Sequence, residues 1–108
     1  MHKISIKPLS VNKAWQWKRF KTPEYKNYEQ ILLYKLPRLE VPKWKLRIDY
    51  EFGFSNKLSD IDNPVKQFQD ILTKKYWFKD SDIYELTIHK EIVPKGEEYV
   101  AFIITSIE

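Results

Sequence analysis

Acidic residues gather around one short segment of the sequence, and they are its strongest sign of chemistry. The segment runs from Asp60 to Asp70, and Asp80 follows it. Asp60 and Asp62 are two residues apart, so their carboxylates point the same way if the backbone there is extended. Like charges held together are stabilised by a cation, and oxygen ligands without His or Cys suit Mg²⁺ or Mn²⁺. The pattern predicts a metal site that activates water and stabilises the charge that develops on a phosphodiester.

The same segment continues into a predicted helix with one polar stripe. Asp62, Lys66 and Asp70 recur at helical spacing along this stripe, opposite the apolar side chains. A second explanation requires no metal, because acidic side chains before a helix satisfy its free N–H groups and complement its dipole. Lys66 and Asp70 can likewise form an ordinary surface ion pair. Both explanations remain open from the pattern alone.

Hydrophobic periodicity predicts the elements that position these residues. Apolar and polar residues alternate in the predicted strands, and a capping residue followed by Pro opens each predicted helix, at Thr22-Pro23 and Asn63-Pro64. The predicted elements are strands over 3–7 and 44–52, helices over 23–36 and 64–75, and strands over 83–93 and 99–107. The last two strands are expected to pair as a hairpin. The order β-α-β-α-β-β predicts a small single α+β domain over residues 1–108, with two helices against a mixed β-sheet.

A polar and aromatic loop is predicted between the first strand and the first helix. Lys and Arg side chains there can contact phosphates, and aromatic rings can stack on bases or wedge between them. The alternative is that Trp15 and Trp17 anchor the core or a dimer while the lysines form a solvated rim. The candidate nucleic-acid-binding residues of this loop are Asn12, Lys13, Lys18, Arg19 and Lys21.

Composition narrows the possible chemistry. The 108 residues include no Cys and two His, which excludes a disulfide scaffold, a thiol nucleophile and a zinc site made of Cys or of His alone. His89 is expected to be structural, and His2 to lie at a frayed end. No apolar run approaches the ~20 residues of a membrane span, and the N-terminus lacks a signal-peptide stretch, so a soluble cytoplasmic protein is expected. The net charge of +4 is a mild bias toward polyanions.

Several of these motifs together resemble the RusA family of Holliday-junction resolvases. The resemblance covers about three-quarters of the chain and implies a small homodimeric, Mg²⁺-dependent endonuclease that nicks four-way DNA junctions symmetrically. Such enzymes are common in prophages and act in DNA recombination and repair. Because a junction has two-fold symmetry, two nicks require one active site in each subunit. The motifs are Asp60-x-Asp62-Asn63-x-x-Lys66 with Asp70, then Asp80-Ser81-Asp82-Ile83, and the N-terminal Pro8-Leu9-Ser10-Val11-Asn12-Lys13.

Position by position, the resemblance implies four catalytic residues. Asp60, Asp62 and Asp80 match the catalytic aspartates and would be the metal ligands, with Mn²⁺ as a possible substitute for Mg²⁺. Lys66 matches the essential lysine and would stabilise the phosphate or the leaving oxygen. Asp70 matches an acidic helix position and is assigned a supporting role.

The chain departs from the family pattern in two places. Lys79-Asp80 stands where the family often has Asp-Asp, which leaves Asp82 as the alternative third ligand. The loop before the first aspartate carries a single Lys, whereas the best-known members are rich in arginine there. The alternative function is a catalytically inactive nucleic-acid-binding module of the same fold, and a protein-interaction domain is a third possibility. A dimer interface is expected at Trp44, Tyr50 or Trp77.

Overall fold

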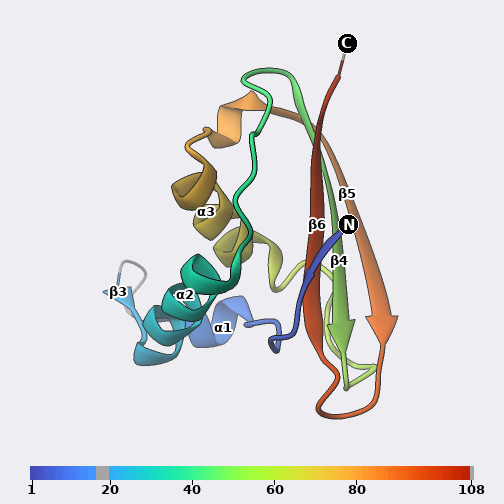
Figure 1. Cartoon of the computed structure of the whole chain (residues 1–108). Coiled ribbons are helices and arrows are strands. Elements are labelled where there is room, and N and C mark those ends of the chain that lie inside the picture. The colour runs from blue at the N-terminus through green and yellow to red at the C-terminus, as the bar shows by residue number, and fades with distance from the viewer. Residues whose placement is uncertain (17–19, 108) are drawn as a thin grey trace.

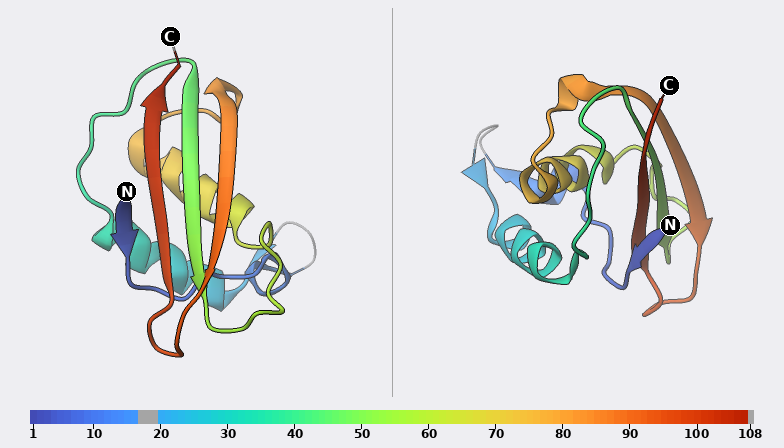
Figure 2. Two further views of the ribbon diagram at one scale, coloured as in Figure 1. Left: turned by 90° about the vertical axis from the view of Figure 1, so that its right-hand side faces the viewer. Right: turned by 45° about the horizontal axis from the view of Figure 1, so that its top comes forward.

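The computed structural model describes residues 1–16 and 20–107, and it has the predicted α+β architecture. The main sheet has four strands in the order β1-β6-β4-β5, and β2 and β3 form a separate small ribbon. The helices cover one face of the main sheet, while its other face carries no described element (Figures 1 and 2). The elements are β1 (His2–Ile4), α1 (Val11–Ala14), β2 (Trp15–Gln16), β3 (Phe20–Lys21), α2 (Pro23–Lys35), β4 (Leu46–Phe54), α3 (Val65–Tyr76), the 3₁₀ turn η1 (Asp80–Asp82), β5 (Ile83–Ile92) and β6 (Tyr99–Ser106).

The two long helices begin in different ways. The Thr22 hydroxyl accepts a hydrogen bond from the Tyr25 N–H at 3.1 Å, so the predicted N-cap of α2 is confirmed. The predicted cap of α3 is wrong, because Pro64 rather than Asn63 precedes the helix and no side chain caps it. The cause is that Pro64 already has helical φ and ψ angles, so a turn leads directly into the helix. No described helix has the length and apolar character that a membrane span requires.

The predicted hairpin between the last two strands is wrong. β4 lies between them, parallel to β5 and antiparallel to β6. Residues 93–98 therefore cross the end of β4 instead of forming a tight turn between paired neighbours. β4 takes the central place because its alternation gives it a completely buried inner face, and a central strand is the one that both neighbours help to cover.

An aromatic cluster fixes α3 on the sheet. Phe68 lies at its centre, with edge-to-face ring contacts at 5.6 Å to Tyr50, 5.8 Å to Phe52 and 5.9 Å to Phe102. All four side chains are completely buried. Such contacts each add roughly 0.5–1.5 kcal/mol beyond the burial of apolar area. The helix face opposite this cluster, which carries Lys66 and Asp70, is thereby held in a fixed orientation.

Candidate functional site

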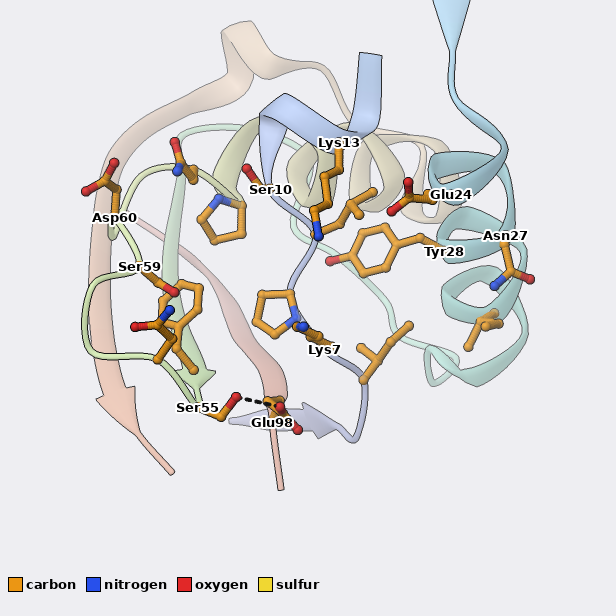
Figure 3. Close-up of a pocket in the computed structure, with 18 residues that line it drawn as sticks. Lys7, Ser10, Lys13, Glu24, Asn27, Tyr28, Ser55, Ser59, Asp60 and Glu98 are labelled. Carbon is orange, nitrogen blue, oxygen red and sulfur yellow. Dashed lines mark hydrogen bonds between the residues drawn. The ribbon is translucent and has the colours of Figure 1, made fainter. Parts of the chain in front are cut away.

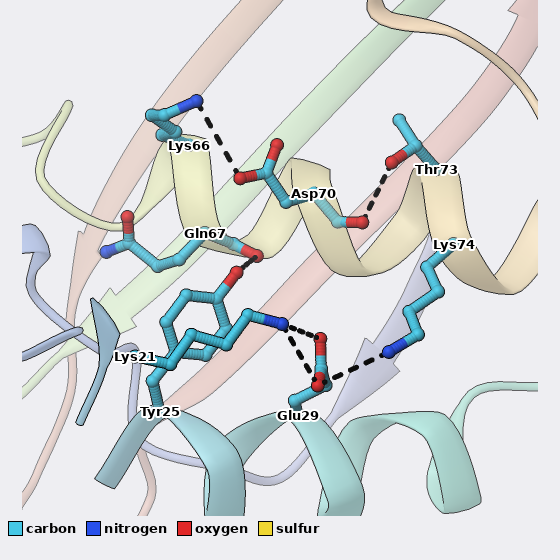
Figure 4. A network of polar contacts seen from close by, with 8 residues as sticks. All are labelled: Lys21, Tyr25, Glu29, Lys66, Gln67, Asp70, Thr73 and Lys74. Atoms are coloured by element: carbon cyan, nitrogen blue, oxygen red, sulfur yellow. Dashed lines mark hydrogen bonds and ion pairs between the residues drawn. The ribbon is translucent and has the colours of Figure 1, made fainter. Parts of the chain in front are cut away.

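The polar stripe of α3 carries an ion pair between Lys66 and Asp70. The Lys66 Nζ lies 3.7 Å from a carboxylate oxygen of Asp70, and the Lys66 side chain is 69% exposed (Figure 4). Partial burial raises the pKa of Asp70, the Lys66 amine counteracts this effect, and the negative charge of Asp80 adds to it. The Lys66 amine lowers the pKa of Asp70 by more than the charge of Asp80 raises it, and burial remains the main cause of the increase.

Asp80 lies beside the middle of α3. Its Oδ1 accepts a hydrogen bond from the Gln69 Nε2 at 3.1 Å, and the Gln69 Oε1 accepts one from the Tyr50 hydroxyl at 3.0 Å. The carboxylate of Asp82 accepts instead from the Lys79 N–H at 3.1 Å. Of the two alternative third ligands, Asp80 is therefore the one that is bonded to α3.

Asp60 and Asp62 lie in consecutive turns before α3. The Asp60 carbonyl accepts from the Asn63 N–H at 3.3 Å, and the Asp62 carbonyl accepts from the Val65 N–H at 3.2 Å. Both aspartates are exposed. Residues 61–64 form turns, so the extended backbone on which the parallel arrangement of the two carboxylates depended is absent.

The structure does not bring the three predicted metal ligands together. Among the described residues, one group of at least three potential ligands has its ligand atoms within 4.8 Å of one another, and that group lies on the open face of the sheet. Asp60 and Asp62 precede α3, whereas Asp80 is bonded to Gln69 in its second turn. The oxygen donors themselves suit Mg²⁺, which often takes only one or two carboxylates beside water and phosphate. The donor chemistry fits Mg²⁺, but no closed site of three carboxylates is formed.

The structure does bring the N-terminal motif to the acidic turn. The Val11 N–H donates to the Asn63 carbonyl at 3.1 Å. The completely buried Gln67 amide donates to the Asn63 carbonyl at 2.6 Å and also to the Leu9 carbonyl. Buried polar groups are costly without partners, so this amide favours one docking position of the N-terminal segment. Two segments that are far apart in the sequence thus form one surface.

A cavity of about 540 Å³ lies between these segments and α2 (Figure 3). Ser10 and Lys13 line it from the N-terminal segment, Tyr28 from α2, and Asp60 from the loop after β4. Its lining combines apolar side chains with both signs of charge. The cavity therefore places a predicted metal ligand and a predicted phosphate contact in the same depression of the surface.

Three of the five predicted nucleic-acid-binding residues lie in the part of the chain that the structure describes. Asn12 and Lys13 are exposed on α1, where they can reach a bound polyanion. Lys18 and Arg19 lie outside the described residues, as does Trp17. Asn12, Lys13 and Lys21 are therefore the members of this predicted set that lie among the described residues.

Lys21 has a protein partner. Its Nζ lies 3.0 Å from the Glu29 carboxylate, which is also 3.5 Å from the Lys74 Nζ (Figure 4). This pairing holds β3 against α2 and offsets the charge of Lys21. Trp15 packs edge-to-face on the buried Tyr25, with ring centres 5.1 Å apart, which favours the core alternative for this tryptophan.

The three aromatic residues expected at a dimer interface differ in exposure. Tyr50 is completely buried, so it is not available to a second copy of the chain. Trp77 is 93% exposed and Trp44 is 59% exposed. These two tryptophans remain as possible contact residues.

Comparison with known proteins gives no assignment, because no protein-family model matches the chain and no curated protein matches it. The chemistry of the site therefore rests on its own residues. These are an exposed amine paired with the Asp70 carboxylate, the Asp80 carboxylate bonded to α3, two further exposed aspartates, and a cavity lined by Asp60 and the N-terminal segment. Such a set can bind a divalent cation and a phosphate.

Proposed function

We propose that this chain is a Mg²⁺-dependent, structure-selective DNA endonuclease that resolves four-way junctions, as its resemblance to the RusA family implies. The observation that carries this proposal is the docking of the Pro8–Lys13 segment on the Asp60–Asn63 turn. The Val11 N–H donates a hydrogen bond to the Asn63 carbonyl at 3.1 Å. The buried Gln67 amide donates to the carbonyls of both Leu9 and Asn63 and so joins the two segments. These segments hold the two motifs on which the resemblance rests, so their contact supports a shared function.

Each residue of the site has a distinct role in the proposal. Asp60, Asp62 and Asp80 would hold Mg²⁺, which when bound activates the attacking water and offsets negative charge on the phosphodiester. Lys66 would donate to the phosphate or the leaving oxygen, since its amine is exposed in the first turn of α3, shortly after Asp60 and Asp62. Asp70 keeps that amine within 3.7 Å of its carboxylate and thereby limits the positions that it samples.

The charge distribution supports a polyanionic substrate. The whole chain carries a net charge of +4, which favours binding to DNA. The exposed aspartates would repel DNA unless a cation were bound to them. Lys13 lines the cavity that also contains Asp60, so a phosphate there would lie near both a cation and a metal ligand. Since a junction has two-fold symmetry, we further propose a homodimer with one site in each subunit.

A cleavage assay tests the proposal directly. The protein is incubated with a synthetic four-way junction and with a matched duplex, with and without Mg²⁺. We expect paired symmetric nicks in the junction that require Mg²⁺ or Mn²⁺, and no nicks in the duplex. Asp60→Asn and Asp62→Asn should abolish cleavage while junction binding persists. Efficient nicking by either variant would remove that aspartate from the site.

Lys66 gives a second, independent test. Lys66→Ala should lower turnover by orders of magnitude with little loss of junction affinity, because the amine acts on charge that develops in the transition state. The matched control is Lys74→Ala, which removes an amine from the same helix two turns further on. If affinity falls in proportion to turnover in Lys66→Ala, Lys66 is a binding residue and the catalytic role is wrong.

A junction-binding module without catalysis is the second candidate function. The separation of Asp80 from Asp60 and Asp62 favours it, because a three-carboxylate site is not already formed. Tight junction binding without nicking in either Mg²⁺ or Mn²⁺ would support this candidate against the enzyme. Absence of both binding and nicking would refute both and leave a protein-interaction domain.

A further inference from the structure

Three potential metal ligands share the face of the sheet that carries no described helix. Glu51 of β4 and His89 of β5 are direct partners in the parallel pair, so their side chains stand side by side on the same face. Glu91 lies two residues further along β5 and therefore on the same face as His89. This face is turned toward the viewer in the left view of Figure 2, with the helices behind the sheet.

The distances within this group are close to those of a metal site. The ligand atoms of the three residues all lie within 4.8 Å of one another, and the His89 Nε2 is 2.7 Å from the Glu91 Oε1. Ligand atoms around a tetrahedral Zn²⁺ ion lie about 3.4 Å apart, as follows from bond lengths near 2.1 Å. Small rotations of exposed side chains are enough to reach that separation.

Glu51 is held in place by a second residue. The Tyr99 hydroxyl donates a hydrogen bond to the Glu51 Oε2 at 2.6 Å. The Tyr99 ring is itself confined, because it lies against Gly53 so closely that a Cβ atom there would be 2.4 Å from it. Metal-binding carboxylates commonly have such a supporting hydrogen bond, which orients them before the ion arrives. One oxygen of Glu51 is thus fixed while the other remains free to bind.

We propose that Glu51, His89 and Glu91 form a binding site for a divalent first-row transition-metal ion such as Zn²⁺, with water completing its shell. Two carboxylates balance the charge of the ion, and the imidazole favours a transition metal over Mg²⁺. Lys3 lies on the same face, because it pairs with Ala101, which in turn pairs with Glu51, and its Nζ lies 3.9 Å from the centre of the Tyr99 ring. The site is separate from the aspartates near α3 and does not depend on the proposed nuclease function.

Titration with Zn²⁺, followed by calorimetry, tests the site. All measurements use a His2→Asn background, in which His89 carries the remaining imidazole. We expect one Zn²⁺ bound per chain, and we expect His89→Gln to weaken binding by at least about tenfold. The matched control is Glu85→Gln, which removes a carboxylate from the same face of β5. The Oε2 of Glu85 lies 2.9 Å from the Arg47 Nη1. That control should leave the affinity for Zn²⁺ unchanged. Circular dichroism confirms that each variant is folded.

Two further measurements distinguish specific metal binding at this site from nonspecific attraction of a cation to carboxylates. The ring signals of His89 in the nuclear magnetic resonance spectrum should shift on addition of Zn²⁺, and millimolar Mg²⁺ should not displace the ion. Equal Zn²⁺ affinity in His89→Gln would overturn the proposal. An equal loss of affinity in Glu85→Gln, displacement by Mg²⁺, or no binding at millimolar Zn²⁺ would overturn it as well.

Discussion

Gly53→Ala is expected to destabilise the protein through one identifiable contact. Gly53 pairs with Tyr99 across β4 and β6. A Cβ atom at this position would lie 2.4 Å from the Cε1 and 2.5 Å from the Cδ1 of the Tyr99 ring. Because carbon atoms pack at about 3.5–4.0 Å, the ring has to move by roughly 1 Å or more. Tyr99 is only 5% exposed and bonded to Glu51 at 2.6 Å, so this movement disturbs both packing and the hydrogen bond.

The size of the effect follows from three contributions. Overpacking costs about 1–3 kcal/mol, and loss of the hydrogen bond costs about 1 kcal/mol because Glu51 keeps some access to water. Replacing Gly in a strand returns about 0.5–1 kcal/mol. The free energy of unfolding should therefore fall by about 1–3.5 kcal/mol. For a domain of this size, each 1 kcal/mol lowers the melting temperature by roughly 4 °C or more.

A double-mutant cycle measured by urea unfolding tests this explanation. The cycle uses the unchanged protein, Gly53→Ala, Tyr99→Ala and the double variant. In the Tyr99→Ala background, Gly53→Ala should be neutral or slightly stabilising, because the ring that it displaces is absent. Unchanged stability of Gly53→Ala would refute the argument. A penalty of the same size in the Tyr99→Ala background would show that the ring contact is not its cause.

Two other predictions concern the C-terminal half of α3 and its cap. Trp77→Gly should raise the free energy of unfolding in urea by up to about 1 kcal/mol, since Trp77 is 93% exposed and has a φ of 58° that Gly adopts without strain; a clear loss would show that its ring is needed. Burial raises the pKa of Tyr76 from 10.0 to about 12, and its hydroxyl donates to the Pro37 carbonyl at 2.6 Å. The folded state then keeps this proton longer than the unfolded state, so stability should decline as pH rises from about 10 to 12. Tyr76→Phe should decline less over that range, and an identical pH profile would contradict the assignment.

Local patterns predicted the elements but not all of their neighbours. Thr22 followed by Pro23 marked the start of α2 because capping depends only on adjacent residues. The partner of a strand depends on tertiary packing. β5 and β6 are similar in length and are joined by a short turn segment, as the strands of a hairpin also are. β4 nevertheless separates them, because it has the most completely buried inner face of the sheet.

The candidate site shows the same division between local and distant information. The polar stripe with Lys66 and Asp70 was predictable from helical spacing, and the ion pair is present. The turn at Asp60 was not, because the helical angles of Pro64 cannot be inferred from a pattern that also fits an extended approach. His89 and Glu91 occupy alternate positions on one predicted strand, although His89 was expected to be structural. Their partner Glu51 appears only when the parallel register of β4 and β5 is known.

The position of β6 determines the order in which the chain can fold as it is synthesised. β6 joins β1 to β4, so Lys3 reaches its partner Ala101 only after about 100 further residues have been made. Until residues 99–106 leave the ribosome, β4 has β5 on one side and an unpaired backbone on the other, next to the apolar side chains of Ile48, Tyr50 and Phe52. Nascent chains with such exposed edges are prone to aggregate, and contacts between distant residues form slowly. β6, which is made after the other strands of this sheet, is therefore the one that closes the sheet and protects the core.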